Sequence, residues 1–256
     1  MIRNRKIKKI STPVKQTVKI QKRRRKQIVK KIVQPVQIEK KRIKSKSNNY
    51  STNREIGKVE KIFKNETIFL IGGGPSLKKF DWNLLNGKRT IAINKAILTY
   101  PNADVLYWTD SRFYNWYKKQ IDQFTGPKYT IRNGPYDDSI TLLKKGIKYG
   151  LEEAPSSLSH GNNSGYAAMN LAYHLGAKKI ILLGYDMGNI NNESHYHGGY
   201  PTKATSNEVY DKQFIPGFTK IGDLLKSKGI EIYNASLISK LNCFPKITFQ
   251  KALSIR

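Results

Sequence analysis

Three consecutive glycines, followed by proline and serine, come directly after an apolar run that ends at Ile71. Gly72, Gly73 and Gly74 have no side chains, so the chain can turn sharply and a ligand can approach the bare backbone. Proline suits a first helical turn, where free backbone amides and the Ser76 hydroxyl can hold an anion. The segment is not a P-loop, because it lacks the Gly-Lys-Ser/Thr of that motif. It is not the dinucleotide fingerprint Gly-x-Gly-x-x-Gly either, because Leu77 occupies the place of the last glycine of that motif. It predicts a phosphate-binding loop, with a plain strand-to-helix turn as the alternative.

Two of the four histidines, His195 and His197, stand two residues apart in a stretch rich in Tyr and Gly. A zinc site is a poor interpretation, because neither a cysteine nor a third histidine is nearby. Imidazoles in such a loop suit general acid–base chemistry or contact with a phosphate. We therefore take His195 and His197 as candidate catalytic residues, with loop histidines that have no role as the alternative.

Polar residues and glycines also follow other apolar runs of the chain. Asp110 is expected first as a helix cap and otherwise as a residue that faces a ligand. The two Asn and one Ser at 162–164 exceed what one cap requires, and the start of a helix favours an anion. The candidates from these segments are Asn94, Asp110, Ser164, Gly165, Gly184 and Asp186.

Short apolar runs alternate with helix-length segments from residue 66 onward, which is the pattern of an α/β domain. The runs lack internal proline and are typical of strands buried on both faces of a sheet. Helices are expected over 111–124, 162–175 and 208–228. Strands are expected over 67–71, 89–93, 104–108, 128–131, 179–183 and 230–233. The sequence thus predicts a Rossmann-like parallel sheet with helices on both faces.

In such sheets, ligands bind beyond the carboxyl ends of the strands. All of the candidate segments above come just after an expected strand or open the helix that follows one. Each signal is weak alone, and their common position is the argument for a single site.

The first 48 residues carry 19 Lys and Arg against one acid, Glu39, within a chain whose net charge is +29. A weak helical stripe of apolar residues stops at Pro35. We expect residues 1–60 to be a basic extended or helical tail with a linker, and residues 61–256 to be the nucleotide-binding domain. The tail is expected to bind nucleic acid or another polyanion, with an acidic membrane surface or a merely solvated extension as alternatives.

Cys243 is the one cysteine in the chain, so no disulfide forms within it. This fits a reducing compartment. Lys or Arg interrupts every apolar run near the start, and no stretch approaches the roughly 18 apolar residues of a membrane span. We expect a protein without a transmembrane segment that resides in the cytoplasm.

Taken together, the motifs resemble a family of uncharacterised Rossmann-like proteins of bacteriophages and prophages. The resemblance covers residues 66–254, and it implies the cytoplasm of a bacterial host. The segments that carry it are Gly-Gly-Gly-Pro-Ser-Leu (72–77), Ala-Ile-Asn (92–94), Pro-Asn-Ala-Asp-Val-Leu-Tyr-Trp-Thr-Asp (101–110), Asn-Ser-Gly-Tyr (163–166), Leu-Leu-Gly-Tyr-Asp-Met (182–187) and His-Tyr-His-Gly (195–198).

That family is similar to the bacterial sialyltransferases, which use a CMP-linked donor sugar. By position, the resemblance implies nucleotide contacts for Asn94, Ser164, Gly165 and Gly184. Three departures stand out. Gly73 replaces an Asn of the sialyltransferase loop, and Asp110-Ser111-Arg112 stands where those enzymes have Asn-Pro-Ser after the third strand. Gly199 stands where their catalytic His is found. His195 or His197 would then have to supply the base.

The family is also similar to the archaeal-type 6-hydroxymethylpterin diphosphokinases, which move diphosphate from ATP with magnesium. This resemblance rests on the glycine-rich loop and the fold. It implies that Asp110 and Asp186, as hard oxygen ligands, would hold Mg²⁺.

The hypothesis that follows is a metal-independent transferase of glycosyltransferase type with a nucleotide-activated sugar donor, CMP-type favoured. Gly72, Gly73, Gly74 and Ser76 would cradle phosphates, and Asn94, Ser164 and Gly165 would hold base and ribose. Asp110 or Asp186 would position the acceptor. The alternatives are the magnesium-dependent diphosphokinase and a non-catalytic phage protein that binds nucleic acid or belongs to the virion.

Overall fold

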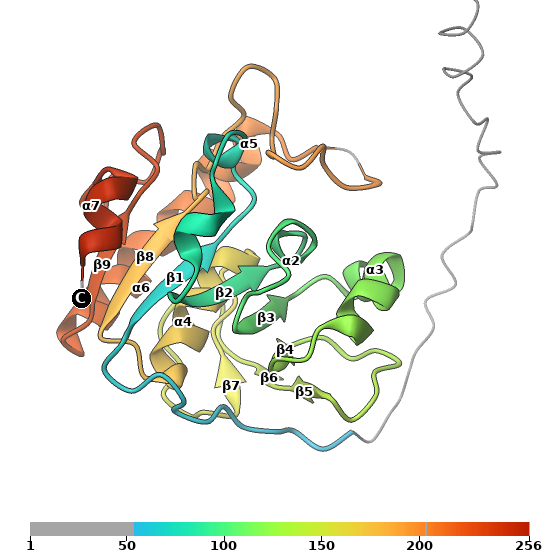
Figure 1. Ribbon diagram of the computed structural model, residues 1–256. Coiled ribbons are helices and arrows are strands. Elements are labelled where there is room, and N and C mark those ends of the chain that lie inside the picture. The colour runs from blue at the N-terminus through green and yellow to red at the C-terminus, as the bar shows by residue number, and fades with distance from the viewer. Residues whose placement is uncertain (1–53, 203, 256) are drawn as a thin grey trace, which may run out of the picture. The chain divides into compact units, whose positions relative to one another are not determined.

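The computed structural model describes residues 54–202 and 204–255. Their centre is a sheet of seven parallel strands in the spatial order β5-β4-β3-β2-β1-β8-β9 (Figure 1). The strands are β1 (Thr67–Ile71), β2 (Arg89–Ile93), β3 (Val105–Trp108), β4 (Lys128–Thr130), β5 (Ile140–Leu142), β8 (Lys179–Leu183) and β9 (Glu231–Asn234). The predicted α/β class with a parallel sheet is confirmed.

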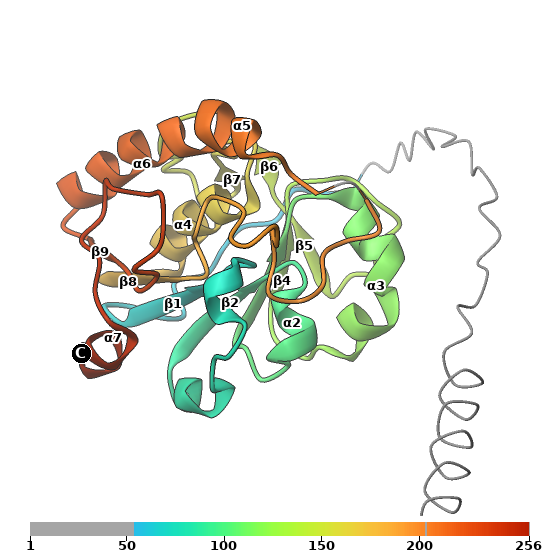
Figure 2. The same ribbon diagram turned by 90° about the horizontal axis from the view of Figure 1, so that it is seen from above.

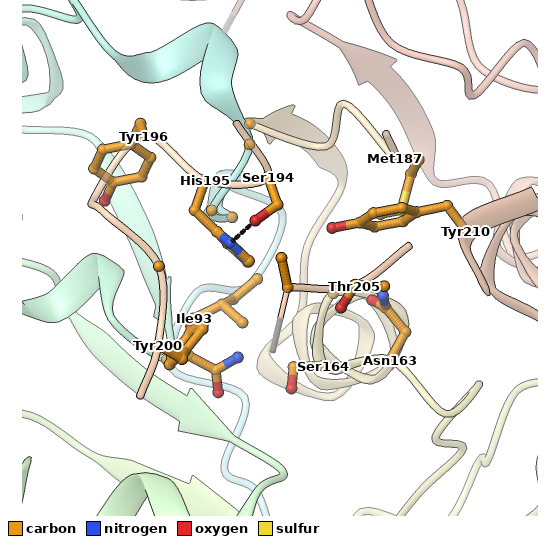
Figure 3. Close-up of a pocket in the computed structure, with 18 of the residues that line it drawn as sticks. Ile93, Asn163, Ser164, Met187, Ser194, His195, Tyr196, Tyr200, Thr205 and Tyr210 are labelled. Carbon is orange, nitrogen blue, oxygen red and sulfur yellow. Dashed lines mark hydrogen bonds between the residues drawn. The ribbon is translucent and has the colours of Figure 1, made fainter. Parts of the chain in front are cut away.

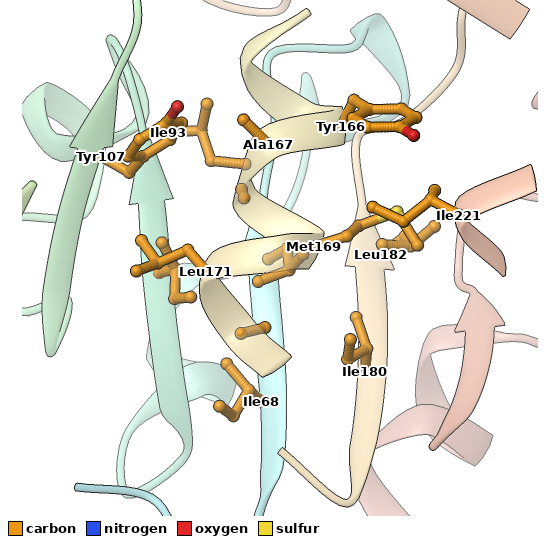
Figure 4. Packing of buried hydrophobic residues seen from close by; sticks show 14 of the residues in the cluster. Ile68, Ile93, Tyr107, Tyr166, Ala167, Met169, Leu171, Ile180, Leu182 and Ile221 are labelled. Carbon is orange, nitrogen blue, oxygen red and sulfur yellow. The ribbon is translucent and has the colours of Figure 1, made fainter. Parts of the chain in front are cut away.

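Helices cover both faces of this sheet (Figure 2). Helices α4 (Ser164–Leu175) and α6 (Ile215–Ser227) pack on one face, while α2 (Ala96–Thr99), α3 (Ser111–Gln123) and α7 (Phe249–Ser254) pack on the other. Alternate residues of each strand serve the two faces, because successive side chains of a strand point to opposite sides. In β1, Ile68 and Leu70 join the core of the first face (Figure 4), and Phe69 and Ile71 join the second.

Strand β1 lies at the topological switch point, where the order of the strands reverses. It pairs with β2 on one side and with β8 on the other, so that Ile71 lies opposite both Ala92 and Leu183. Strands β2 to β5 extend the sheet one way, and β8 and β9 extend it the other. The carboxyl ends of β1 and β8 therefore flank the crevice where ligands bind in open α/β sheets.

Several short elements were not expected from the sequence. They are β5, the separate parallel pair β6 (Lys144–Lys145) and β7 (Ser157–Leu158), the helices α2 and α7, and the 3₁₀ helices η1 (Pro75–Leu77) and η2 (Trp82–Leu85). Segments of two to six residues are too short to display a period.

The single helix expected over 208–228 is divided in the structure. It consists of α5 (Asn207–Val209), one π-helical turn η3 (Tyr210–Phe214) and then α6. Pro216, which has no amide proton to donate, occupies the first turn of α6 directly after the π turn. Single π turns within helices are frequent at functional sites.

The end of the predicted linker lies on the domain. The Arg54 guanidinium donates to the carbonyl oxygens of Tyr136 and Ile140, each at 2.7 Å, and Val59 is buried in the core. All of the described residues belong to one compact unit. The basic tail and the linker up to residue 53 lie outside the described residues, so their expected partners stay predictions. In the part that is described, no helix is long and apolar enough to cross a membrane.

Candidate functional site

A cleft of about 890 Å³ opens at the carboxyl edge of the sheet, between the segments that follow β1, β2, β3 and β8 (Figure 3). Most of the residues singled out in the sequence line it. These are Gly72, Gly73, Gly74, Asn94, Asp110, Ser164, Gly165, Gly184 and His195. Ser76, Asp186 and His197 do not line it.

The glycine loop and the segment after β8 are joined backbone to backbone. The Gly72 amide donates to the Leu183 carbonyl, and the Gly74 amide donates to the Gly184 carbonyl, both at 2.8 Å. A Cβ added to Gly74 would lie 2.6 Å from the Gly184 carbonyl oxygen, so a larger residue has no room there. Within the described part of the chain, the Gly73 amide donates to no protein group and stays available to a ligand.

Asp186 lies beneath the glycine loop and holds it in place. Its side chain is buried and accepts three hydrogen bonds: from the Ser76 amide at 2.7 Å, the Ser76 hydroxyl at 2.6 Å and the Ser236 hydroxyl at 2.5 Å. The anion that Ser76 binds in the structure is thus the Asp186 carboxylate, whereas a phosphate was expected. Ser76 and Asp186 thus hold the glycine loop in place and do not line the cleft, whereas direct contacts with a ligand were expected for both.

Asn94, just after β2, has the left-handed backbone conformation with φ of 52°. Its amide donates to the Tyr107 carbonyl at 2.9 Å, which fixes the turn. Its side-chain oxygen Oδ1 is buried in the cleft wall and has no hydrogen-bond partner among the described residues. A buried acceptor without a partner is costly, so a small rotation of this side chain toward a ligand in the cleft would be favoured.

The first turn of α4 forms the opposite wall of the cleft. Asn163 caps the helix by accepting from the Tyr166 amide at 3.1 Å, and the Ser164 hydroxyl lies 2.5 Å from that of Thr109. No acidic residue stands in this first turn. Ser164 and Gly165 line the cleft at the positive end of the helix, an arrangement that favours a bound anion.

The close approach of Tyr185 leaves no room for a side chain at Gly165. The Tyr185 hydroxyl donates to the Gly165 carbonyl at 3.0 Å, and a Cβ on Gly165 would lie 2.9 Å from the Tyr185 ring. The buried Tyr185 thereby sets the position of the α4 start relative to the segment after β8.

Residues 194–200, which we call the histidine strap, pass over the glycine loop. The Tyr196 amide donates to the Gly73 carbonyl at 3.1 Å. From the other side, the Lys95 ammonium donates to the Gly199 carbonyl at 2.5 Å and to the His197 carbonyl at 3.2 Å. These backbone contacts bring His195 to the cleft.

The two strap histidines have different surroundings. His195 lines the cleft, and its Nδ1 lies 2.8 Å from the Ser194 hydroxyl. His197 stacks on the His195 ring with centroids 4.9 Å apart, and both of its nitrogens are buried without a partner in the described residues. Burial, and then the nearby Lys95, lower the pKa of His195 to about 4. Burial, followed by His195 and Lys95, lowers the pKa of His197 to about 3. Both imidazoles are therefore neutral at neutral pH.

Asp110 is the N-cap of α3, as its position after β3 suggested. Its carboxylate accepts from the Arg112 amide at 2.9 Å and pairs with the Arg112 guanidinium at 2.5 Å. Burial raises the pKa of Asp110, but the hydrogen bonds from Arg112 outweigh burial, so the pKa lies below its usual value. The carboxylate lines the cleft in its ionised form, already paired.

The sequence did not indicate the aromatic side of the cleft. Trp116 and Tyr200 line it with ring centroids 6.3 Å apart, and the Arg112 guanidinium lies over Trp116 at 5.3 Å. Tyr210 and Phe214 of the π turn line it as well. Trp116 belongs to an amphipathic helix and Tyr200 to a loop, and no local pattern marks either as a ligand contact. Among the described residues, no group of three His, Cys, Asp or Glu side chains gathers into a metal site.

Comparison with known proteins gives a likeness of fold. No protein-family model matches the chain, and no curated protein matches it either. The MAf glycosyltransferase of Magnetospirillum magneticum AMB-1 matches with a TM-score of 0.53 and 14% identity, over 78% of this chain and 36% of that one. The sialyltransferase CstII of Campylobacter jejuni, solved in complex with cytidine-5'-monophosphate, matches with a TM-score of 0.48 and 17% identity, over 72% of this chain and 86% of that one. This chain spans about a third of the length of the MAf glycosyltransferase and shares its α/β fold.

Proposed function

We propose that this chain is a transferase of glycosyltransferase type that uses a nucleotide-activated sugar, with a CMP-linked donor favoured. The observation that carries the proposal is the convergence on one cleft of the Gly73 amide, the Asn94 side chain and the α4 N-terminus. The resemblance to sialyltransferases assigns Asn94, Ser164 and Gly165 to the nucleotide. A fold shared with the MAf glycosyltransferase is consistent with this assignment.

In the described part of the cleft wall, the cations have no free positive charge with which to bind the donor phosphate. Each cation on the cleft wall is already paired with a carboxylate: Lys78 with Glu193 at 2.6 Å, and Arg112 with Asp110 at 2.5 Å. The phosphate would therefore be held chiefly by backbone amides at the Gly73 turn and the first turn of α4.

The transfer step uses His195 as the base. The acceptor hydroxyl oxygen forms a bond to the anomeric carbon of the donor sugar, and the bond from that carbon to the phosphate oxygen breaks. The electron pair of the broken bond leaves with the nucleotide monophosphate, and the hydroxyl proton passes to Nε2 of His195. This role requires the tautomer in which Nδ1–H donates to the Ser194 hydroxyl. The pKa of about 4 keeps the imidazole unprotonated at neutral pH. An anionic donor phosphate bound beside it would raise that pKa toward the range in which a histidine is an effective general base.

The magnesium-dependent diphosphokinase is the alternative, and the contacts of its two expected ligands do not favour it. Asp186 is buried with three hydrogen bonds, and Asp110 is engaged by Arg112. Neither carboxylate would bind Mg²⁺ without giving up these partners. The third alternative, a non-catalytic phage protein, depends on the tail, which lies outside the described residues.

The test is release of CMP from a CMP-linked sugar by the full chain, with and without added sugar acceptors. We expect release without added metal, and a fall of roughly 100-fold or more in kcat for His195→Ala, the usual loss for a general base. The matched control is His174→Gln, a histidine of α4 that does not line the cleft. Diphosphate transfer from ATP that needs magnesium, with no CMP release from any CMP-sugar, would contradict the proposal.

A further inference from the structure

A second, basic cavity lies beside the cleft. It measures about 470 Å³, and it is lined by Arg132, Lys144 and Lys145 with no carboxylate among its lining residues. None of these three cations forms an ion pair with a described residue. They contrast with the cations of the cleft itself, Lys78 and Arg112, which are neutralised by carboxylates.

The segment that follows β3 separates this cavity from the cleft. Ser111 lines the basic cavity while its neighbours Asp110 and Arg112 line the cleft. The Arg132 guanidinium donates through Nε to the carbonyl of Thr109, another residue of the cleft wall, at 3.1 Å. The two cavities thus share a wall at the end of β3.

His160 lies close to these cations and to the start of α4. Its Nδ1 accepts from the amide of Asn162, which lines the cleft. Burial lowers the pKa of His160 first, and then the charges of Lys145, Arg132 and Lys148 lower it further. The basic cavity therefore brings positive charge near the cleft wall at the start of α4.

We propose that the basic cavity binds a phosphate or carboxylate group of an acceptor glycan, so that an accepting hydroxyl of the same molecule reaches the cleft. This inference rests on the proposed glycosyl transfer and names the class of acceptor. Cations that are concentrated without an ion-pair partner among the described residues favour an anionic ligand. The lining holds no aromatic residue on which a nucleobase would stack, so the observations favour an anionic sugar over single-stranded nucleic acid.

The test measures binding of small charged and neutral sugars to the CMP-saturated full chain by calorimetry. The probes are 3'-sialyllactose against lactose for a carboxylate, and mannose 6-phosphate against mannose for a phosphate. We expect at least one charged probe to bind more tightly than its neutral partner. The variant Arg132→Gln/Lys144→Gln/Lys145→Gln should weaken that binding roughly tenfold, because exposed charges each contribute a modest share. The two pairs of probes distinguish carboxylate from phosphate.

A matched control removes the same charge elsewhere. Lys220, Lys226 and Lys251 are exposed on α6 and α7, line neither cavity and form no ion pair with a described residue. Changing these three to Gln should leave the affinity for the charged probe unchanged. Equal weakening in both triple variants, or no preference for the charged probes, would overturn the inference. The inference would also be overturned if the Arg132 triple variant weakened the binding of a single-stranded DNA 20-mer and left the binding of the charged sugars unchanged.

The donor site is measured in the same proteins, which separates the two claims. Both triple variants should retain the CMP-dependent rise in melting temperature. A wild-type chain that binds no CMP contradicts the proposed function, whereas intact CMP binding without charged-sugar preference contradicts only the inference about the acceptor.

Discussion

Gly73 lies directly against His195, so that a Cβ added to the glycine would be 2.9 Å from Cδ2 of the imidazole and 3.3 Å from Nε2 of His197. The glycine loop and the histidine strap, which are more than 100 positions apart in the chain, meet at this contact. The missing side chain at position 73 leaves the space that the histidine strap fills.

Gly73→Ala should therefore displace the strap and reduce transfer more than stability. The added methyl must push the half-buried imidazole of His195, and small misplacements of a catalytic group are costly to the rate. We expect a fall in kcat of roughly tenfold or more with the fold retained. A double-mutant cycle with His195→Ala provides the control, since the methyl should have little further effect once the ring is gone. Additive losses would mean that the two residues act independently.

Asp186→Ala should destabilise the domain and disorganise the glycine loop. The substitution leaves the Ser76 amide, the Ser76 hydroxyl and the Ser236 hydroxyl without their acceptor. Removing a charged acceptor from buried donors costs about 3 kcal/mol of unfolding free energy, measured by denaturant titration. Ser236→Ala, which removes one of the three bonds, should cost about 1 kcal/mol. An Asp186→Ala chain with wild-type stability and abolished turnover would instead support the catalytic role expected from the sequence.

Ser164→Ala should weaken CMP binding about tenfold if its hydroxyl contacts the nucleotide, which is the usual effect of one lost hydrogen bond. Thr109→Val is the matched control, because it breaks the same 2.5 Å hydroxyl pair without altering Ser164. We expect Thr109→Val to bind CMP with nearly wild-type affinity in a calorimetric titration. Equal losses in both variants would locate the effect in the pair itself, and ligand contact by Ser164 would be contradicted.

The strap histidines should make the domain sensitive to acid. Their pKa values are lowered to about 4 and about 3 in the folded chain, against about 6.5 in the unfolded chain. Between these values the unfolded state binds more protons, so stability is highest above pH 6.5 and falls as the pH drops through 4 to 3. The double variant His195→Asn/His197→Asn should lose less stability than wild type over this range in urea titrations. Parallel curves for the two proteins would contradict the burial of neutral imidazoles.

Local patterns predicted the long elements and part of the site. Strands β1 and β8 each contain four consecutive apolar residues after a polar first residue, and they occupy the expected positions. Because the carboxyl ends of parallel strands meet at one edge, most residues that follow strands converge on the cleft. The capping role of Asp110 could also be predicted from the sequence, because it depends only on the amide of Arg112, two residues away.

The remaining features depend on pairs far apart in the chain. Ser76 and Asp186 are 110 positions apart, and neither residue type indicates that one neutralises the other. The contact of Gly73 with the histidine strap likewise joins residues that are far apart in the chain. The basic cavity combines the end of β4 with the two-residue strand β6, which is too short to be recognised in a sequence.

Nucleotide binding by the full chain tests the central claim most directly. Melting temperatures would be measured with CMP, UDP, GDP and ATP, each with and without magnesium, because a ligand that binds the native state raises the melting temperature. The proposed donor site predicts a rise with CMP that does not need magnesium and that Asn94→Ala diminishes. A rise with ATP and magnesium alone, or no rise with any of the four nucleotides, would contradict it.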